Sequence, residues 1–232
     1  GKKEFPFYTM KYVEGVPPAR FLYENGMDWF PVIGYRLLAK LAELHARGYI
    51  FGDLKSDNIL VSGYGTTELI DYGGLTVCGK AVRQYTERYD RGYWQAGSRS
   101  ADGQYDLFAF AITCVEMAED GANKLRSLES KPTRSVDDLC HLIEELPHLR
   151  KVAPLIMSCL QGRMPSAADA LVAWRRMVYS SLSRRSEEQV AKSRLQGRAS
   201  IAMTAGLVTA CALSLAVFGV MLYWTLHPAP WP

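Results

Sequence analysis

Four polar side chains in the first third of the sequence have the types that phosphate chemistry requires. Asp53, Lys55 and Asn58 lie in one short segment, and Asp71 follows after an apolar stretch. Transfer of a phosphoryl group needs oxygen ligands for Mg²⁺, a carboxylate that orients the attacking hydroxyl, and a cation that neutralises charge on the transferred group. These four side chains supply that set, so the sequence favours a site that holds a divalent metal ion and a phosphate group.

The elements around these residues are predicted from hydrophobic periodicity. Apolar residues recur at helical spacing from Pro31 to Arg47, and Gly48 follows in the position of a C-cap. The β-rich segments 59–61 and 68–70 flank a turn-forming segment, which predicts a hairpin between Asn58 and Asp71. A helix followed by a loop and a hairpin is therefore expected to position the four side chains.

The rest of the sequence predicts a mainly helical protein. The segment from Asp106 to Ala118 is nearly all apolar, as in a buried helix, and amphipathic helices are expected at 136–146, 152–160 and 167–182. An aromatic-rich strand is expected from Phe5 to Val13. Residues 76–104 lack periodicity over a stretch longer than ordinary connections, which indicates a functional or mobile segment.

The two polar segments together resemble the protein kinase family. The catalytic loop H-R-D-L-K-x-x-N of that family is matched from Asp53 through Asn58, and its D-F-G motif is matched by Asp71-Tyr72-Gly73. The resemblance implies that Asp53 orients the substrate hydroxyl and accepts its proton, and that Lys55 contacts the γ-phosphate. It further implies that Asn58 and Asp71 bind Mg²⁺ and that the substrates are ATP and protein hydroxyls.

The resemblance extends through nearly all of residues 5–180 and implies further site residues. Met10 is similar to the gatekeeper, the backbone of Lys11 and Val13 would face the adenine, and Leu60 would form the adenine floor. Asp106 is similar to the aspartate that anchors the catalytic loop, and Arg163 to the late arginine of the C-lobe. The fold class implied is mainly α (α+β), with residues 1–16 as the last N-lobe strand and hinge and 17–182 as the C-lobe.

Several positions depart from the family pattern. Phe51-Gly52 replaces His-Arg before the catalytic aspartate, so the arginine that would bind an activation-loop phosphate is absent. The A-P-E motif should fall near Trp94, but no glutamate is present there to pair with Arg163, which must find another partner or stay exposed. Among the hydroxyls of the activation segment, Thr86 is the first candidate for phosphorylation.

The glycine-rich loop and the phosphate-binding strand lysine of the family are not found in the 232 residues. We therefore expect the chain to lack the N-lobe and its true N-terminus, and to be a poor catalyst alone. Two alternatives stay open: a pseudokinase that acts as a membrane scaffold, and a small-molecule phosphotransferase of the kinase-like fold. Gly52-Asp53 resembles the H-G-D opening of the latter enzymes, whereas Lys55 and the Asp106 helix favour a protein kinase.

Charge and cysteine usage exclude other classes. The formal net charge of +3 is too small for a polyanion-binding protein, so any basic function must come from local clustering. The five cysteines are scattered and never spaced as C-x-x-C, which argues against a disulfide framework and a zinc site. We expect them to be small buried hydrophobic residues in a reducing compartment.

The C-terminal part predicts a membrane anchor. Residues 201–226 contain no charged side chain, and a segment of this length is enough to cross a bilayer as a single transmembrane helix. Tyr223-Trp224 lie where the interfacial aromatic belt of such a helix is expected. The basic juxtamembrane segment 183–200 places the kinase domain in the cytoplasm by the positive-inside rule and leaves 227–232 as a short external tail. The same segment is a candidate for binding anionic lipid or DNA, although Glu187 and Glu188 dilute its charge.

Overall fold

The computed structural model describes residues 11–178, together with the single residues Leu207 and Ser214. Residues 11–178 belong to the first of two compact units, which comprises residues 1–178. Met10, the basic segment 183–200 and the external tail 227–232 lie outside the described residues, as does the predicted transmembrane helix 201–226 except for those two positions. No helix in the described part of the chain is both long and apolar enough to cross a membrane.

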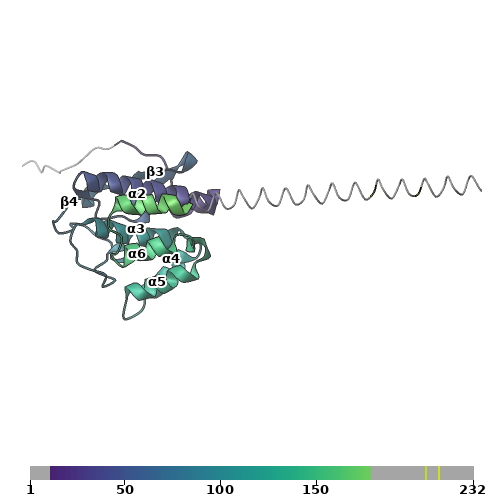
Figure 1. The fold of residues 1–232 in the computed structure, drawn as a ribbon. Helices are drawn as coiled ribbons and strands as arrows, with labels where there is room; N and C mark the ends of the chain where they lie inside the picture. The colour runs from purple at the N-terminus through teal and green to yellow at the C-terminus, as the bar shows by residue number, and fades with distance from the viewer. Residues whose placement is uncertain (1–10, 179–206, 208–213, 215–232) are drawn as a thin grey trace, which may run out of the picture. The chain divides into compact units, whose positions relative to one another are not determined.

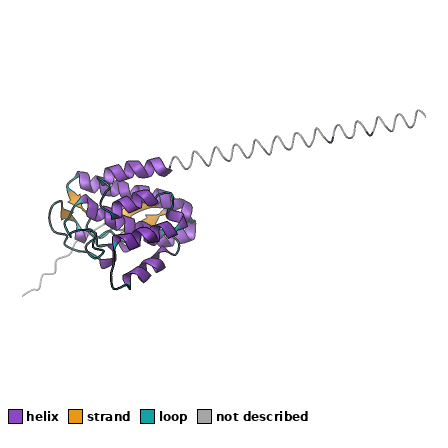
Figure 2. Ribbon diagram, turned by 60° about the horizontal axis from the view of Figure 1, so that its bottom comes forward, coloured by secondary structure: helices purple, strands orange, loops and turns teal. Residues whose placement is uncertain are grey.

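Helices make up most of the unit, as Figures 1 and 2 show. They include α1 (Pro18–Asn25), α2 (Phe30–Ala46), α3 (Gly103–Met117), α4 (Gly121–Glu129), α5 (Val136–Glu145) and α6 (Ala153–Leu160). A further helix occupies residues 167–178 at the end of the described unit. The predicted helices at 31–47, 106–118, 136–146 and 152–160 are confirmed within a few residues, whereas α1 and α4 were not predicted.

The strands are short and form two antiparallel pairs. Strand β1 (Tyr49–Ile50) pairs with β4 (Thr76–Val77), and β2 (Ile59–Ser62) pairs with β3 (Thr66–Leu69). The second pair is the predicted hairpin, which is therefore confirmed. A mainly helical architecture with few short strands is what the sequence predicted.

The segment before α1 runs beside β2. Val16 donates its backbone N–H to the carbonyl oxygen of Val61 at 3.0 Å and accepts the N–H of Val61 at 2.8 Å. The strand predicted for residues 5–13 is not found in its described part, because residues 11–15 form no strand and backbone pairing begins at Val16.

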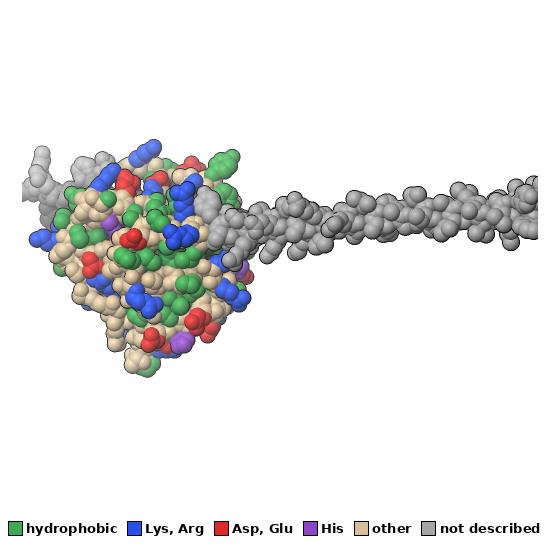
Figure 3. All heavy atoms as spheres, in the orientation of Figure 1, with side chains coloured by type: hydrophobic (Ala, Val, Ile, Leu, Met, Phe, Trp, Pro, Cys, Tyr) green, Lys and Arg blue, Asp and Glu red, His purple; other side chains and the backbone are tan. Residues whose placement is uncertain are grey.

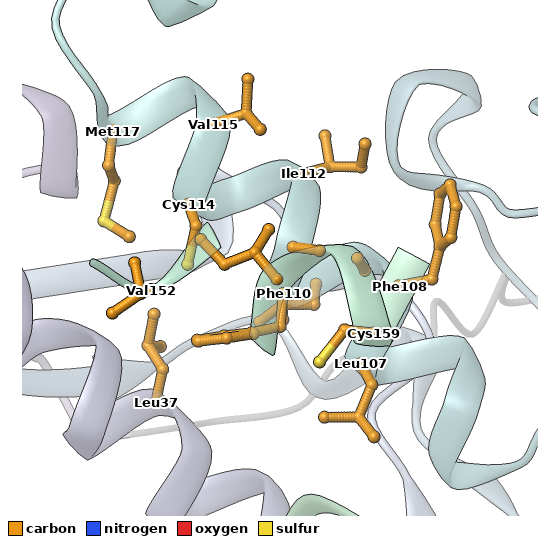
Figure 4. Close-up of a cluster of buried hydrophobic side chains, with 14 of the residues drawn as sticks. Leu37, Leu107, Phe108, Phe110, Ile112, Cys114, Val115, Met117, Val152 and Cys159 are labelled. Carbon is orange, nitrogen blue, oxygen red and sulfur yellow. The ribbon is translucent and has the colours of Figure 1, made fainter. Parts of the chain in front are cut away.

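The core is built around α3, whose side chains are buried on nearly every face. Helix α2 packs on one side of α3, and α4 and α6 pack on the others. Figure 4 shows Leu37 of α2 in the same cluster as Phe110 and Cys114 of α3 and Cys159 of α6. A helix surrounded in this way needs apolar residues all round, which explains the lack of a polar stripe in the sequence from Asp106 to Ala118.

The cysteine prediction is confirmed in part. The four described cysteines are free thiols; Cys114 and Cys159 are buried, Cys140 is partly buried, and Cys78 is exposed. Burial raises the pKa of the Cys159 thiol to about 12. The predicted burial therefore holds for Cys114 and Cys159, and it is wrong for Cys78, which follows strand β4 at the surface. The reducing compartment stays a prediction.

On the face drawn in Figure 3, basic and acidic side chains are interspersed and neither kind gathers in one region. This distribution agrees with the small net charge of the chain. It offers no extended positive surface on that face for a polyanion.

The helix of residues 167–178 closes the unit by packing on α2 (Figure 1). Trp174 is fully buried and donates its indole N–H to the carbonyl oxygen of Pro31 at 2.9 Å. Its ring lies at centroid distances of 5.7 Å from Phe30 and 5.6 Å from Phe110. Gly34 leaves room for this ring, because a Cβ built there would lie 2.1 Å from a ring carbon.

Replacement of Gly34 by alanine tests this packing. Alanine is the better helix former by about 1 kcal/mol, yet the overlap with the Trp174 ring should reduce the free energy of unfolding by about 1–3 kcal/mol. Denaturant unfolding measures the difference. The matched control is Gly63→Ala, whose Cβ would meet nothing within 4 Å; equal stability of the two variants would contradict the packing described.

Candidate functional site

The three polar residues of the predicted catalytic loop lie together. Asp53 is buried, and one of its carboxylate oxygens lies 3.0 Å from the ammonium nitrogen of Lys55. The Asn58 side-chain amide donates to the Asp53 carbonyl oxygen at 2.8 Å and to its carboxylate at 3.2 Å. Asn58 thus holds the Asp53 carboxylate in place from one side while Lys55 balances its charge.

The segment of Asp71 lies against this loop. The backbone N–H of Ile70 donates to the carbonyl oxygen of Asn58 at 2.9 Å, which places Asp71 one residue from a direct contact. Gly74 packs so closely on Asp53 that a Cβ built on Gly74 would lie 3.0 Å from the Asp53 Cβ. The two segments therefore converge, as the predicted site requires.

Two glycines permit this close approach. Gly52 has φ +80°, and a Cβ built on it would lie 2.8 Å from the carbonyl oxygen of Gly74. Strands β1 and β4 pair directly beside the contact and bring the two segments into register. A side chain at Gly52 would meet both the strained backbone and the neighbouring carbonyl.

The oxygen atoms available for a metal ion fit Mg²⁺. The nitrogen of the Asn58 amide is engaged by Asp53, which leaves its oxygen for another ligand. Asp71 adopts a left-handed conformation with φ 56°, and its Oδ1 accepts the N–H of Gly73 at 3.2 Å, which leaves Oδ2. Mg²⁺ is commonly bound by one or two protein oxygens plus water and phosphate. Within residues 11–178 no group of three or more His, Cys, Asp or Glu side chains could hold a metal ion.

Thr86 contacts two residues of the predicted catalytic loop. Its hydroxyl donates to Asp53 Oδ1 at 3.1 Å and accepts from the Lys55 ammonium at 3.3 Å. The geometry therefore assigns Thr86 to holding Asp53 and Lys55 in the unmodified chain, and phosphorylation of Thr86 stays a prediction.

Asp106 anchors the loop from below. It is fully buried in the first turn of α3, and its two oxygens accept the backbone N–H groups of Phe51 at 2.8 Å and Gly52 at 2.9 Å. His45 of α2 contacts the same carboxylate, with Nε2 2.8 Å from Oδ2. The position of Asp106 agrees with the predicted anchor, whereas His45 was missed because nothing in the local sequence sets it apart from other polar residues at a helix end.

Phe51 takes the place of the histidine that the family carries. Its ring is buried and meets the Tyr72 ring edge to face, at a centroid distance of 5.5 Å. Apolar contact between the catalytic loop and the segment after Asp71 is thus kept by two aromatic rings.

The segment between β4 and α3 is tied down by two ion pairs that the sequence did not predict. Arg91 forms a double contact with Asp102, at 2.8 and 2.7 Å, and Asp102 also caps α3. Arg99 lies 2.6 Å from the fully buried Asp90, which also accepts from the Tyr105 hydroxyl at 3.1 Å. Burial and the nearby Asp90 carboxylate raise the pKa of Tyr105, so its hydroxyl remains a donor.

Arg163, which resembles the late arginine of the C-lobe, takes a course that the missing glutamate left open. Its side chain is exposed and its guanidinium contacts the side chain of Gln161. Arg91 and Arg99 pair with Asp102 and Asp90 in the segment between β4 and α3.

The predicted adenine-facing residues are placed in part. Lys11 is exposed, Val13 and Leu60 are partly buried, and Met10 lies outside the described residues. Gly15 packs directly on Leu60, since a Cβ built on Gly15 would lie 3.1 Å from the Leu60 Cβ. The segment that leads into α1 therefore passes over the residue predicted to form the adenine floor.

The chain is similar in sequence to Ser/Thr protein kinases. It is 40% identical over 165 residues to Serine/threonine-protein kinase YabT of Bacillus subtilis (strain 168), which covers 70% of this chain and 47% of that protein. It is 30% identical over 128 residues to Serine/threonine-protein kinase PAK 4 of Homo sapiens, covering 53% of this chain and 21% of that protein. The chain thus spans less than half the length of these relatives. No family model matches it.

A solved structure has the same fold. The ROP18 kinase domain in complex with AMP-PNP and sucrose superposes with a TM-score of 0.54 and 17% sequence identity, covering 72% of this chain and 50% of that chain.

Replacement of Asp106 by asparagine tests the anchor of the catalytic loop. The amide can accept only one of the two backbone N–H groups and turns a donor toward the other. We expect the free energy of unfolding to fall by about 2–3 kcal/mol, because a buried donor is left without an acceptor. Denaturant unfolding measures it. Asp57→Asn is the control, since Asp57 is exposed in the same loop; a loss of similar size there would refute the anchor.

Proposed function

Since the chain is a homologue of Ser/Thr protein kinases and has a protein-kinase-like fold, we propose that it carries the catalytic loop of a membrane-anchored enzyme that transfers the γ-phosphate of ATP to protein hydroxyls. The observation that carries the proposal is the contact set around Asp53, whose carboxylate meets Lys55, Asn58 and Thr86. Homology to protein kinases favours protein hydroxyls over small molecules as acceptors.

Each residue has a role in this proposal. Asp53 accepts a hydrogen bond from the substrate hydroxyl and takes its proton as the new bond to the γ-phosphorus forms, while the bond from that phosphorus to the bridging oxygen breaks and ADP leaves. Lys55 lies beside that carboxylate and neutralises charge on the transferred group. Asn58 and Asp71 would hold Mg²⁺ through the oxygens described above, and the bound ion would neutralise charge on the phosphates.

The nucleotide base is assigned to the segment before α1. Met10, the backbone of Lys11 and Val13, and the side chain of Leu60 form this part of the proposal. The ROP18 kinase domain, which has the same fold, is a complex with AMP-PNP, and this supports the use of a nucleotide by the chain. The glycine-rich loop and the strand lysine are not among these 232 residues, so we assign full activity to the chain joined to a lobe that supplies them.

Replacement of Asp71 by asparagine in the full-length protein tests the enzyme. Loss of one metal-binding carboxylate should reduce phosphate transfer from ATP to protein by about a hundredfold or more, because the charge of the phosphates is no longer balanced. Transfer of labelled phosphate at fixed Mg²⁺ concentration measures this. Asp28→Asn is the control because Asp28 is exposed on the surface before α2.

Two results would refute parts of the proposal. Unchanged phosphate transfer by the Asp71→Asn protein would remove Asp71 from the metal site. A full-length protein with no transfer activity, and with no change on Asp53→Asn, would leave the pseudokinase or scaffold as the better account.

We propose further that residues 201–226 span the cell membrane once and that residues 11–178 face the cytoplasm. The uncharged stretch of 201–226 and the basic residues of 183–200 on its N-terminal side support this topology. The bilayer is then a partner of the chain, and the substrates are proteins that reach the cytoplasmic face.

Deletion of residues 201–226 tests the anchor. The intact chain should remain in the membrane pellet after alkaline carbonate extraction, because its apolar segment is buried in lipid, and the deleted chain should move to the supernatant. Protease added to inverted vesicles should digest residues 11–178, which a cytoplasmic location requires. Recovery of both forms in the pellet would contradict the anchor.

A further inference from the structure

A cluster of charged side chains lies beside the proposed site and has no role in the chemistry above. It consists of Arg88, Glu116 near the end of α3, and Glu129 at the end of α4. Arg88 follows Thr86 by two residues, within the 3₁₀ turn Glu87–Tyr89. The cluster therefore connects the helical core to the residue that contacts Asp53.

Arg88 contacts both carboxylates at once. Its Nε and Nη2 lie 2.8 Å from the two oxygens of Glu129, and its Nη1 lies 2.9 Å from Glu116 Oε1. The side chain of Arg88 is only 22% exposed, that of Glu129 is 20% exposed, and that of Glu116 is 13% exposed. A two-point contact between guanidinium and carboxylate fixes orientation as well as distance, and partial burial reduces its screening by solvent.

Glu116 also contacts the catalytic loop. Its Oε2 accepts hydrogen bonds from the hydroxyls of Ser56 and Tyr89. Ser56 follows Lys55 directly, and its N–H donates to the Tyr89 oxygen at 3.4 Å. Burial and Glu116 raise the pKa of Tyr89, so the phenol remains a donor to the carboxylate.

The turn that carries Thr86 is fixed from its far end. Tyr89 donates its N–H to the Thr86 carbonyl oxygen at 2.9 Å, which closes the turn. The indole N–H of Trp94 donates to the Arg88 carbonyl oxygen at 2.7 Å. Thr86 therefore presents its hydroxyl to Asp53 and Lys55 from a turn held by Arg88 and Tyr89.

We propose that Arg88 is a positioning residue for phosphate transfer: its contacts with Glu116 and Glu129 hold the turn Glu87–Tyr89 so that Thr86 keeps Asp53 and Lys55 in reactive geometry. This inference rests on the proposed function. Arg88 does not touch the reacting groups, so its loss should alter the turnover of bound substrate and leave nucleotide binding unchanged.

Kinetics of the full-length protein with Arg88→Ala test the proposal. We expect kcat to fall about tenfold to a hundredfold, since a small misplacement of reacting groups has effects of this size. KM for ATP should stay within about twofold of the unaltered protein. The kcat of Arg88→Lys should lie between that of Arg88→Ala and that of the unaltered protein, because one ammonium cannot contact both oxygens of Glu129 in the same fixed geometry.

Hydrogen exchange supplies a readout that does not depend on activity. The amide of Tyr89 should exchange faster in the Arg88→Ala protein, while the amides of α2 stay protected. Arg20→Ala is the matched control, because Arg20 also pairs with a glutamate but is 67% exposed on α1. It should change neither kcat nor the exchange of Tyr89.

A second variant keeps the test valid if Arg88→Ala folds poorly. Glu129→Gln retains the size of the side chain and removes the charge that Arg88 contacts, so it should lower kcat in the same direction. The two substitutions combined should lower kcat by less than the product of their separate effects, because both remove one interaction. Independent, multiplicative effects would overturn the proposal.

Failure of the positioning role and failure of the proposed function give different results. If the unaltered protein transfers phosphate and Arg88→Ala retains its kcat, the positioning role is overturned and the proposed function stands. If kcat falls only in proportion to the folded fraction measured by circular dichroism, Arg88 is structural and the proposal is also overturned. If the unaltered protein transfers no phosphate, the proposed function fails, and the positioning role fails with it.

Discussion

The site depends on the hydrogen bonds between the Asp106 carboxylate and the loop before Asp53. The carboxylate carries negative charge in a fully buried position, and that position is stabilised because both oxygens accept backbone N–H groups of the loop before Asp53. The interaction is reciprocal: the loop turns where it does because its donors need an acceptor, and the carboxylate tolerates burial because the loop supplies them. A short polar segment is thereby joined to the most buried helix of the fold.

The segment between β4 and α3 is held by charge as well as by apolar packing, since its Trp94 is fully buried in the core. Arg91 with Asp102 and Arg99 with Asp90 connect the middle of the segment to its C-terminal end and to the start of α3. Because Asp102 also caps α3, the same side chain begins the core helix and closes the loop in front of it. Residues 76–104, which the sequence indicated as functional or mobile, are thus extensively paired in the structure.

Sequence patterns predicted the elements with strong local signals. The buried helix around Phe110, the amphipathic helices and the hairpin after Asn58 all follow from period and turn chemistry, and the motif around Asp53 indicated which polar residues would meet. The contacts of His45 and Arg88 are different, since each joins residues far apart in the sequence through side chains with no local signature. Helices α1 and α4 were missed because their apolar residues are interspersed with polar ones over only 8 and 9 residues, whereas α6, also 8 residues long, is nearly all apolar.

The backbone conformation of Gly52 restricts which residue can precede Asp53, apart from the resemblance of Gly52-Asp53 to small-molecule phosphotransferases. At φ +80°, with the carbonyl oxygen of Gly74 only 2.8 Å from where a Cβ would lie, the position disfavours the arginine that the resemblance to protein kinases would place before the catalytic aspartate. An arginine could fit there only if the segment following Asp71 took another path. Substitutions at Gly52 and in that segment are therefore coupled through backbone packing.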